Sequence, residues 1–205
     1  MLVIPEEDKY FTIAEQIRTE IKIKGSKFIC TAIPTTDVSS TNDLLKLIRQ
    51  QYFDATHNCF AYKLNSDGAI FRYSDDGEPS GSAGKPILFT INKYNFTDIL
   101  VVVTRFFGGT KLGVGGLVRA YSDSAEESLK LATPLIKYIS KEYSINCSYK
   151  DVSLVKRLIL PFAISQDEHY FDSITINIKV PLSRSTEFEK YIYEKTEAKI
   201  SAIAL

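Results

Sequence analysis

The chain has 205 residues, 44% of them hydrophobic and 24% charged, which is the usual balance of a globular protein with one large domain or two small ones. Its 25 basic and 25 acidic residues cancel, which argues against a nucleic-acid binder that depends on net charge and leaves only a local patch for that role. No apolar run approaches the ~20 residues that cross a bilayer. The start MLVIPEEDKY lacks the pattern of a signal peptide, so we expect a cytoplasmic protein.

Three cysteines, Cys30, Cys59 and Cys147, are widely spaced, and no C-x-x-C motif occurs. The odd number and the spacing argue against a disulfide framework and against a structural zinc site. We expect each cysteine to be a small, buried hydrophobic residue.

Glycine placement divides the chain into two regions. All 10 glycines lie between Gly25 and Gly116, and none follows. Because glycine serves tight turns and close backbone approaches, the two regions are built under different backbone demands. We place the boundary at Pro134, which predicts a first domain over 1–135 and a second over 136–205.

The first region begins with a weak strand pattern at 10–13 and a β-hairpin in which 19–24 and 27–33 alternate around Gly25. A helix ending near Tyr52 follows, with Ser40, Thr41 and Asn42 as candidate N-caps. Residues 57–64 and 69–74 form a second hairpin around the turn at 67–68.

Three further elements complete this region. A short helix is predicted to carry Pro86 in its first turn. The apolar, β-branched run 98–107 predicts a buried central strand. A glycine-rich loop then leads into a long helix, beginning near Gly115, with Leu117, Tyr121 and Ala125 on one stripe.

The second region predicts a ferredoxin-like order. Residues 139–149 and 199–205 are strand-like, and 173–180 alternate strictly between apolar and polar. Asp151 and Ser185 are candidate N-caps of two helices. With one more strand, either near 163–166 or near Tyr170, the order is βαββαβ, an antiparallel sheet with two helices on one face, so the chain is predicted to be an α+β protein.

Two glycine-rich stretches resemble phosphate-binding motifs only superficially. A P-loop requires glycine where this chain has Pro79, and a hydroxyl where it has Pro86. A dinucleotide fingerprint at 113–118 fails because Val118 stands where glycine or alanine is required.

Basic residues surround the start of the long helix. Arg105, Lys111 and Arg119 flank a loop whose following helix start carries unpaired N–H groups and a partial positive charge. Two interpretations compete. Either the glycines serve packing and the arginines pair with the acids at 75–78, or this end of the helix binds an anion such as an RNA phosphate.

Acidic and histidine side chains lie in or near the other glycine-rich loop. Asp75, Asp76 and Glu78 are more often turn-forming residues than a metal or proton-sharing site. His57 and Cys59 would share one face of a strand, where a hydrogen-bonded structural histidine is favoured over a nucleophile pair. We expect no metal, no cofactor and no catalytic residues here.

Three stretches carry a family resemblance: ATHNCFAY at 55–62, YSDDGEPSGSAGKPIL at 73–88 and VVVTRFFGGTKLGVGGLVRAY at 101–121. They are similar to the signature of the IMPACT/YigZ family of uncharacterised and translation-linked proteins, and KGSKF at 24–28 fits the same family. The resemblance covers essentially the whole chain and matches the bacterial two-domain type.

The resemblance implies a first domain with the ribosomal-protein-S5-domain-2-like fold and a second, ferredoxin-like domain similar to one in elongation factor G. Eukaryotic members restrain a kinase that acts on translation initiation through an additional domain, so that role does not carry over. The matched motif residues become the expected binding site: Asp75, Asp76, Gly77, Glu78, Arg105, Gly108, Gly109, Lys111, Gly113, Gly116, Arg119 and Tyr121.

The favoured hypothesis is a non-enzymatic protein of translation regulation that binds RNA, the ribosome or a translation factor through this arginine-flanked cleft. Phe106, Phe107 and Tyr121 would be available to stack on bases, although at least one of the two phenylalanines should be buried. An enzyme or sensor for a small phosphorylated or anionic ligand in the same cleft is the alternative. A protein regulator using the second domain's open sheet face, expected to be uncharged to basic around Lys179, is a third.

Overall fold

The computed structural model describes residues 2–205, and its chain divides into two compact units. The first is Tyr10–Lys137, and the second is Tyr138–Leu205 together with the residues up to Lys9. The sequence-based division kept residues 1–9 with the first domain. In the structure Asp8 belongs with the second unit because its carboxylate accepts hydrogen bonds from the amide and hydroxyl of Ser183.

The first unit is built on a five-stranded antiparallel sheet in the order β2-β3-β6-β4-β5. Its strands are β2 (Ile17–Ile23), β3 (Ser26–Pro34), β4 (His57–Leu64), β5 (Ile70–Ser74) and β6 (Ile99–Phe106). Both predicted hairpins are confirmed. A separate two-stranded sheet pairs β1 (Lys9–Ile13) with β7 (Pro134–Tyr138).

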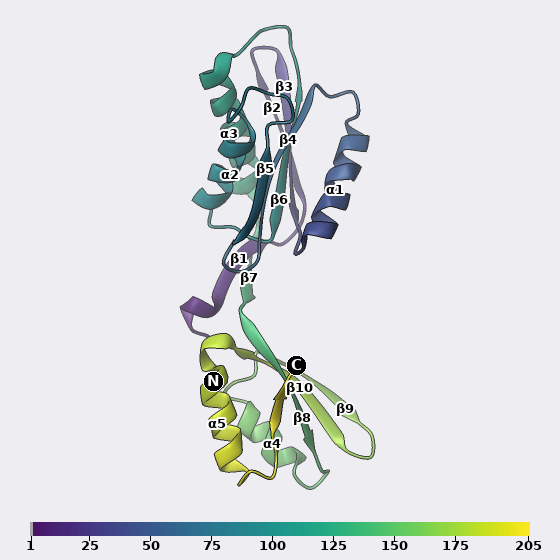
Figure 1. Ribbon diagram of the computed structural model, residues 1–205, viewed down its shortest axis with the longest axis vertical. Helices are drawn as coiled ribbons and strands as arrows, with labels where there is room; N and C mark the ends of the chain where they lie inside the picture. Colours follow the sequence, from purple (N-terminus) through teal and green to yellow (C-terminus); the bar gives the residue numbers. More distant parts are fainter. Residues whose placement is uncertain (1) are drawn as a thin grey trace. The chain divides into compact units, whose positions relative to one another are not determined.

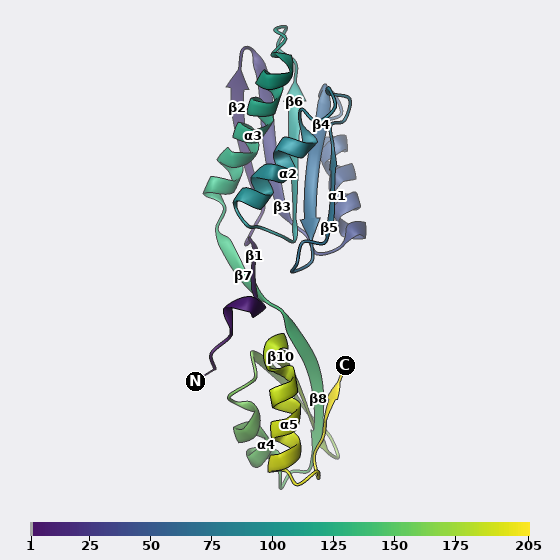
Figure 2. The same cartoon turned by 60° about the vertical axis from the view of Figure 1, so that its left-hand side comes forward.

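Helices cover both faces of the five-stranded sheet (Figure 1). Helix α1 (Val38–Gln51) lies on one face, and α2 (Gly84–Lys93) and α3 (Gly113–Leu131) lie side by side on the other (Figure 2). Strand β6 is buried on both faces, as predicted: Val101 and Val103 join the core under α2 and α3, whereas Leu100 and Val102 join the core under α1. The alternation of a strand therefore determines which face each β6 side chain reaches.

Two helix starts differ from the predicted ones. Helix α1 is capped by Asp37, whose carboxylate accepts from the amide of Ser40 at 2.9 Å, so Ser40 lies inside the first turn instead of at the cap. Hydrogen bonding from Ser40 lowers the pKa of Asp37. Helix α3 begins at Gly113, two residues before the predicted start.

The second unit has the predicted βαββαβ order, with strands β8 (Ser140–Cys147), β9 (Ser165–Tyr170), β10 (Ile174–Pro181) and β11 (Ala202–Ala204) and helices α4 (Val152–Ile159) and α5 (Ser185–Lys195). The antiparallel sheet has the order β11-β8-β10-β9. Both helices lie on the same face (Figure 2). The inward side chains of β10, Ile174, Ile176, Ile178 and Val180, are buried as their alternation predicted.

Neither residue predicted to cap α4 or α5 makes a capping hydrogen bond. Asp151 occupies the N-cap position with a helical backbone conformation and makes no capping hydrogen bond; its carboxylate accepts from the hydroxyl of Ser148 instead. Ser185 is already helical, and its hydroxyl donates to the carbonyl of Leu182.

The open face of the second sheet also differs from the expectation of an uncharged-to-basic surface. Register places Lys179 of β10 opposite Glu142 of β8, and the two side chains form an ion pair with a 2.8 Å N–O distance. Asn177 lies opposite Asp167 of β9. Strand pairing therefore brings acids from β8 and β9 onto this face and gives it both signs of charge.

Candidate functional site

Four connections meet at one end of the five-stranded sheet, where β2, β5 and β6 end and β3 and β4 begin. They are the β2–β3 turn, the segment before β4, the β5–α2 loop and the β6–α3 loop. Backbone hydrogen bonds from Thr56 to Arg105 and from Phe107 to the Thr56 hydroxyl hold two of them together. The two glycine-rich segments thus lie at the same end of the sheet.

A buried hydrogen-bonded pair lies beneath this end. Arg105 points to the face covered by α2 and α3, and its Nη1 lies 2.6 Å from Oε1 of Glu78. The hydroxyl of Tyr121 donates to the same oxygen at 2.8 Å. The Arg105 and Glu78 side chains are only 6% and 4% exposed, so the guanidinium is neutralised inside the protein. This is the pairing of arginine with a loop acid that the packing interpretation favoured.

The other predicted cations do not share this arrangement. Lys111 and Arg119 are exposed, and within the described residues neither has an ion pair. Arg119 lies on the side of α3 away from Leu117, which is buried against the sheet. Of the three predicted cations, Arg105 is therefore buried and paired with Glu78, whereas Lys111 and Arg119 are reachable from solvent.

Asp75 organises the β5–α2 loop. Its carboxylate accepts hydrogen bonds from the backbone amides of Gly81, Ala83 and Gly84 at 2.8–2.9 Å. Two of these amides belong to the start of α2, where Ala83 has no capping side chain of its own. Asp75 therefore caps α2 from nine residues upstream of Gly84, and both of its oxygens are occupied.

Asp76 and the two side chains on β4 have structural partners as well. Asp76 accepts from Arg49 at 3.0 Å and from the amide of Asn58 at 2.7 Å. Nδ1 of His57 lies 2.7 Å from the carbonyl oxygen of Asp76, and the thiol of Cys59 donates to the carbonyl of Asp75 at 3.0 Å. These contacts confirm the structural interpretation of His57 and Cys59 and leave Glu78 as the acid of this loop that borders a cavity.

Burial keeps the two remaining titratable groups of the cluster protonated. Desolvation is the main cause that raises the pKa of the Tyr121 hydroxyl, with further contributions from Cys59 and Glu78. Desolvation likewise raises the pKa of the Cys59 thiol, and the nearby carboxylates raise it further. Since a protonated, fully buried thiol is a poor nucleophile, Cys59 does not fit covalent chemistry.

A cavity of about 300 Å³ separates the Glu78–Pro79 corner from the start of α3. Glu78 and Arg105 form its polar part, and Lys111 is at its edge. The remaining lining is largely apolar and comprises Pro79, Phe107, Leu112, Gly113, Val114 and Leu117. The structure therefore does provide a concavity between the two glycine-rich segments.

The first turn of α3 is open. Leu112 at the N-cap supplies no side-chain hydrogen bond, and the first turn contains no acid. A Cβ added to Gly115 would contact nothing within 4 Å, and its φ is not in the left-handed region. Neither packing nor backbone geometry requires glycine there. Arg119 follows Gly115 by four residues, so it lies one turn further along the same side of the helix, and its side chain is exposed.

The other predicted glycines have different surroundings. Gly108 is in close contact with the β2–β3 turn, because an added Cβ would lie 1.9 Å from the carbonyl carbon of Gly25. Gly109 and Gly113 have φ values of +85° and +71°, which glycine adopts most easily. A Cβ added to Gly116 would lie 3.1 Å from Cβ of Leu112. These glycines shape the loop, and of them only Gly113 borders the cavity.

Aromatic exposure differs from the expectation at one residue. Tyr121 is fully buried, so the expectation that it could stack on a base was wrong. Phe106 is partly buried against Tyr52. Phe107 is 47% exposed and Phe53, in the segment before β4, is 85% exposed. Phe53 gave no signal in the sequence because its exposure depends on where the segment after α1 is placed.

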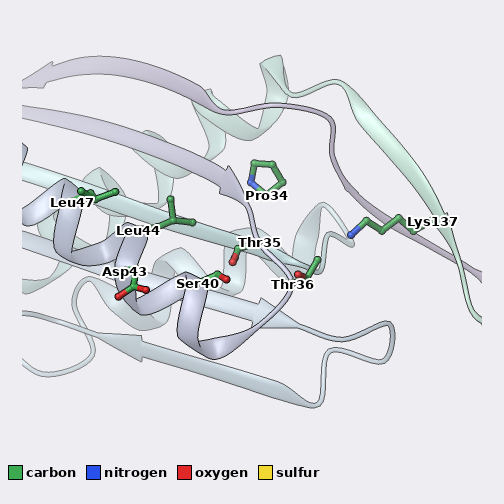
Figure 3. Close-up of a pocket in the computed structure, with 8 residues that line it drawn as sticks. All are labelled: Pro34, Thr35, Thr36, Ser40, Asp43, Leu44, Leu47 and Lys137. Carbon is green, nitrogen blue, oxygen red and sulfur yellow. The ribbon is translucent and has the colours of Figure 1, made fainter.

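A larger hollow of about 510 Å³ lies at the opposite end of the same unit, beside α1 (Figure 3). Its cation, Lys137, points toward Thr36 but forms an ion pair with Asp98 at 3.0 Å. No sequence motif borders this hollow. Over residues 2–205, no cluster of three or more metal-binding side chains occurs, and no helix is long and apolar enough to span a membrane.

Comparisons with known proteins agree on one family. The model of the Impact N-terminal domain matches residues 24–129. The chain is 32% identical to IMPACT family member YvyE of Bacillus subtilis, over 93% of this chain and 88% of that protein. It is 29% identical to IMPACT family member YigZ of Escherichia coli, over 90% and 92%. A crystal structure described as a hypothetical protein matches with a TM-score of 0.70 and 28% identity, covering 97% of this chain and 98% of that one. This chain belongs to the IMPACT family and has its two-domain α+β architecture.

Proposed function

We propose that this chain is a non-enzymatic protein of translation regulation that binds single-stranded RNA at the end of the first unit's sheet where the four connections meet. The link to translation rests on membership in the IMPACT family. The choice of RNA rests on the chemistry of this end, where exposed aromatic rings lie beside reachable cations.

The observation that carries the proposal is the open first turn of α3. Its amides have no capping side chain, and the exposed Arg119 lies one helical turn after Gly115 on the same side of α3. A helix start of this kind attracts a phosphate through unpaired N–H groups and the helix dipole. In the adjoining cavity, Nε of the buried Arg105 has no hydrogen-bond partner among the described residues, so an acceptor on a bound group would satisfy it.

Aromatic residues supply the second half of RNA recognition. Phe107 borders the cavity, and its ring lies 5.4 Å from the Arg105 guanidinium carbon. Phe53 is exposed on the neighbouring connection. Lys24 of the β2–β3 turn is exposed at the same end. Bases stack on such rings regardless of sequence, while the cations contact the phosphates.

The size of the cavity favours a second candidate, a small phosphorylated ligand. A volume of about 300 Å³ is at the lower end of the range for small-molecule sites, and its lining is mostly apolar. A nucleoside monophosphate would then bind by itself, and RNA would not bind.

Salt-dependent RNA binding by the full chain tests the proposal. A labelled single-stranded RNA of mixed sequence is titrated at several salt concentrations. The double variant Lys111→Ala/Arg119→Ala should weaken binding and reduce the slope of log affinity against log salt by about 0.7 for each lost phosphate contact. Lys46→Ala is the matched control, since Lys46 is exposed on α1 and pairs with Asp43.

Equal affinity for the double variant and the control would contradict the proposal. Binding of a nucleoside monophosphate without any binding of RNA would replace it by the small-ligand candidate.

A further inference from the structure

We propose that the cavity at the start of α3 takes one nucleobase of the bound strand and that Glu78 selects guanine. This inference rests on the proposed RNA binding and adds the base preference, which phosphate contacts cannot provide.

The two oxygens of Glu78 have different surroundings. Oε1 accepts from both Arg105 and Tyr121, at 2.6 and 2.8 Å. Within residues 2–205, Oε2 has no hydrogen-bond partner. It is also not fully buried, since the fully buried atoms without a partner do not include it. Because Glu78 borders the cavity, Oε2 is an acceptor that an incoming group can reach.

The charge of the cavity favours a neutral guest with N–H groups. Arg105 and Glu78 cancel each other, and Lys111 at the edge is the cation that an attached phosphate can contact. Apolar side chains from Phe107 to Leu117 form most of the wall. A positively charged amine would lose its hydration there without a free counter-charge, whereas a flat, uncharged ring would not.

Guanine fits this acceptor better than uracil. The Watson–Crick edge of guanine presents two adjacent donors, N1–H and the N2 amino group, to a carboxylate oxygen. Uracil presents a single N–H between two carbonyl oxygens, and both would face the negative charge of Glu78. Adenine and cytosine each present an amino group beside a ring acceptor and should be intermediate. Reading of this edge is how proteins recognise unpaired bases in RNA.

The test compares oligonucleotides bound by the full chain: an octamer of uridines and octamers in which one central uridine is replaced by guanosine, adenosine or cytidine. We expect the guanosine strand to bind about tenfold more tightly than the uridine strand, a ratio typical of one specific base contact. Glu78→Gln replaces an acceptor by a donor and should abolish this ratio.

A second pair of variants keeps the test decisive if Glu78→Gln does not fold. Val114 is 58% exposed and borders the cavity, so Val114→Phe fills the cavity from the surface. Val118 is 37% exposed on the same helix and does not border it, so Val118→Phe is the matched control. Val114→Phe should abolish the guanosine preference, and Val118→Phe should preserve it.

The outcomes separate this inference from the proposed function. Equal binding of all four strands, still weakened by Lys111→Ala/Arg119→Ala, overturns the guanine site and leaves RNA binding intact. A guanosine preference that survives Val114→Phe also overturns the site. Absence of binding to every strand overturns the proposed function itself.

Discussion

The backbones of Gly25 and Gly108 lie in direct contact, although the two residues are far apart in the sequence. The neighbouring Ser26 is 82 residues from Gly108. A Cβ on Gly108 would lie 1.9 Å from the carbonyl carbon of Gly25 and 2.3 Å from the amide of Ser26. The Ser26 hydroxyl accepts from the amide of Gly108 at 3.1 Å. This contact fixes the β6–α3 loop against the β2–β3 turn and so positions the start of α3.

Gly108→Ala should separate these two backbones. A methyl group cannot fit at 1.9 Å, so the loop must shift, and overpacking of this kind destabilises by about 1–3 kcal/mol. Urea unfolding of the full chain measures the change. An unchanged unfolding midpoint would show that the loop accommodates the methyl group elsewhere.

Gly115→Glu should change stability and binding in opposite directions. The added side chain meets open space, and replacing a helical glycine by a better helix former stabilises by roughly 0.5–1 kcal/mol. A carboxylate in the first turn also interacts favourably with the helix dipole, but it repels a phosphate at the same amides. We expect a higher melting temperature together with weaker RNA binding. If the variant binds RNA as tightly as the parent, α3 does not contact phosphate.

Tyr121→Phe should destabilise the first unit. The hydroxyl donates to the buried Glu78 carboxylate, and hydrogen bonds to charged groups contribute about 1.5–3 kcal/mol. Tyr73→Phe is the control, since Tyr73 is 43% exposed and has no side-chain hydrogen bond among the described contacts. Chemical denaturation compares the two, and equal effects would show that the Tyr121 hydroxyl contributes nothing beyond its packing.

Thiol reactivity should report burial of the cysteines. Burial raises the pKa of Cys30 to about 12, and it raises the pKa of Cys147 as well. A folded-state pKa above the usual value of 9.0 means that the protonated thiol stabilises the fold below pH 9 and that this contribution is lost as the pH rises toward 12. At pH 8 a thiol reagent should therefore leave the native protein unmodified and label all three cysteines after denaturation. Rapid labelling of native protein would contradict the buried positions.

Strands could be predicted where apolar residues follow a clear pattern along the sequence. The apolar run of β6 has β-branched residues at Val101, Val102 and Val103, which marked a strand buried on both faces. The strict alternation of β10 from Ile174 to Val180 identified its inward face. Local chemistry sufficed in these cases because side chains of a strand alternate between its two faces whatever the rest of the fold.

Helix caps were less predictable because several polar residues compete for each start. Ser40 was a reasonable cap by type, but Asp37 accepts its amide. Asp75 caps α2 across a loop of glycines and serines, and no short-range pattern marks that contact. Which polar side chain accepts a helix amide depends on the backbone conformation that brings it within reach.

The sequence by itself determined the family, the α+β order of elements and the two glycine-rich segments that carry the expected site. Only the tertiary structure decided what the charged residues do: Arg105 is neutralised by Glu78, whereas Lys111 and Arg119 remain reachable. The physical reason is that element type follows from local spacing, whereas the state of a charge follows from its burial and partners. Glu78 and Tyr121 are 43 residues apart and meet only when α3 packs on the sheet.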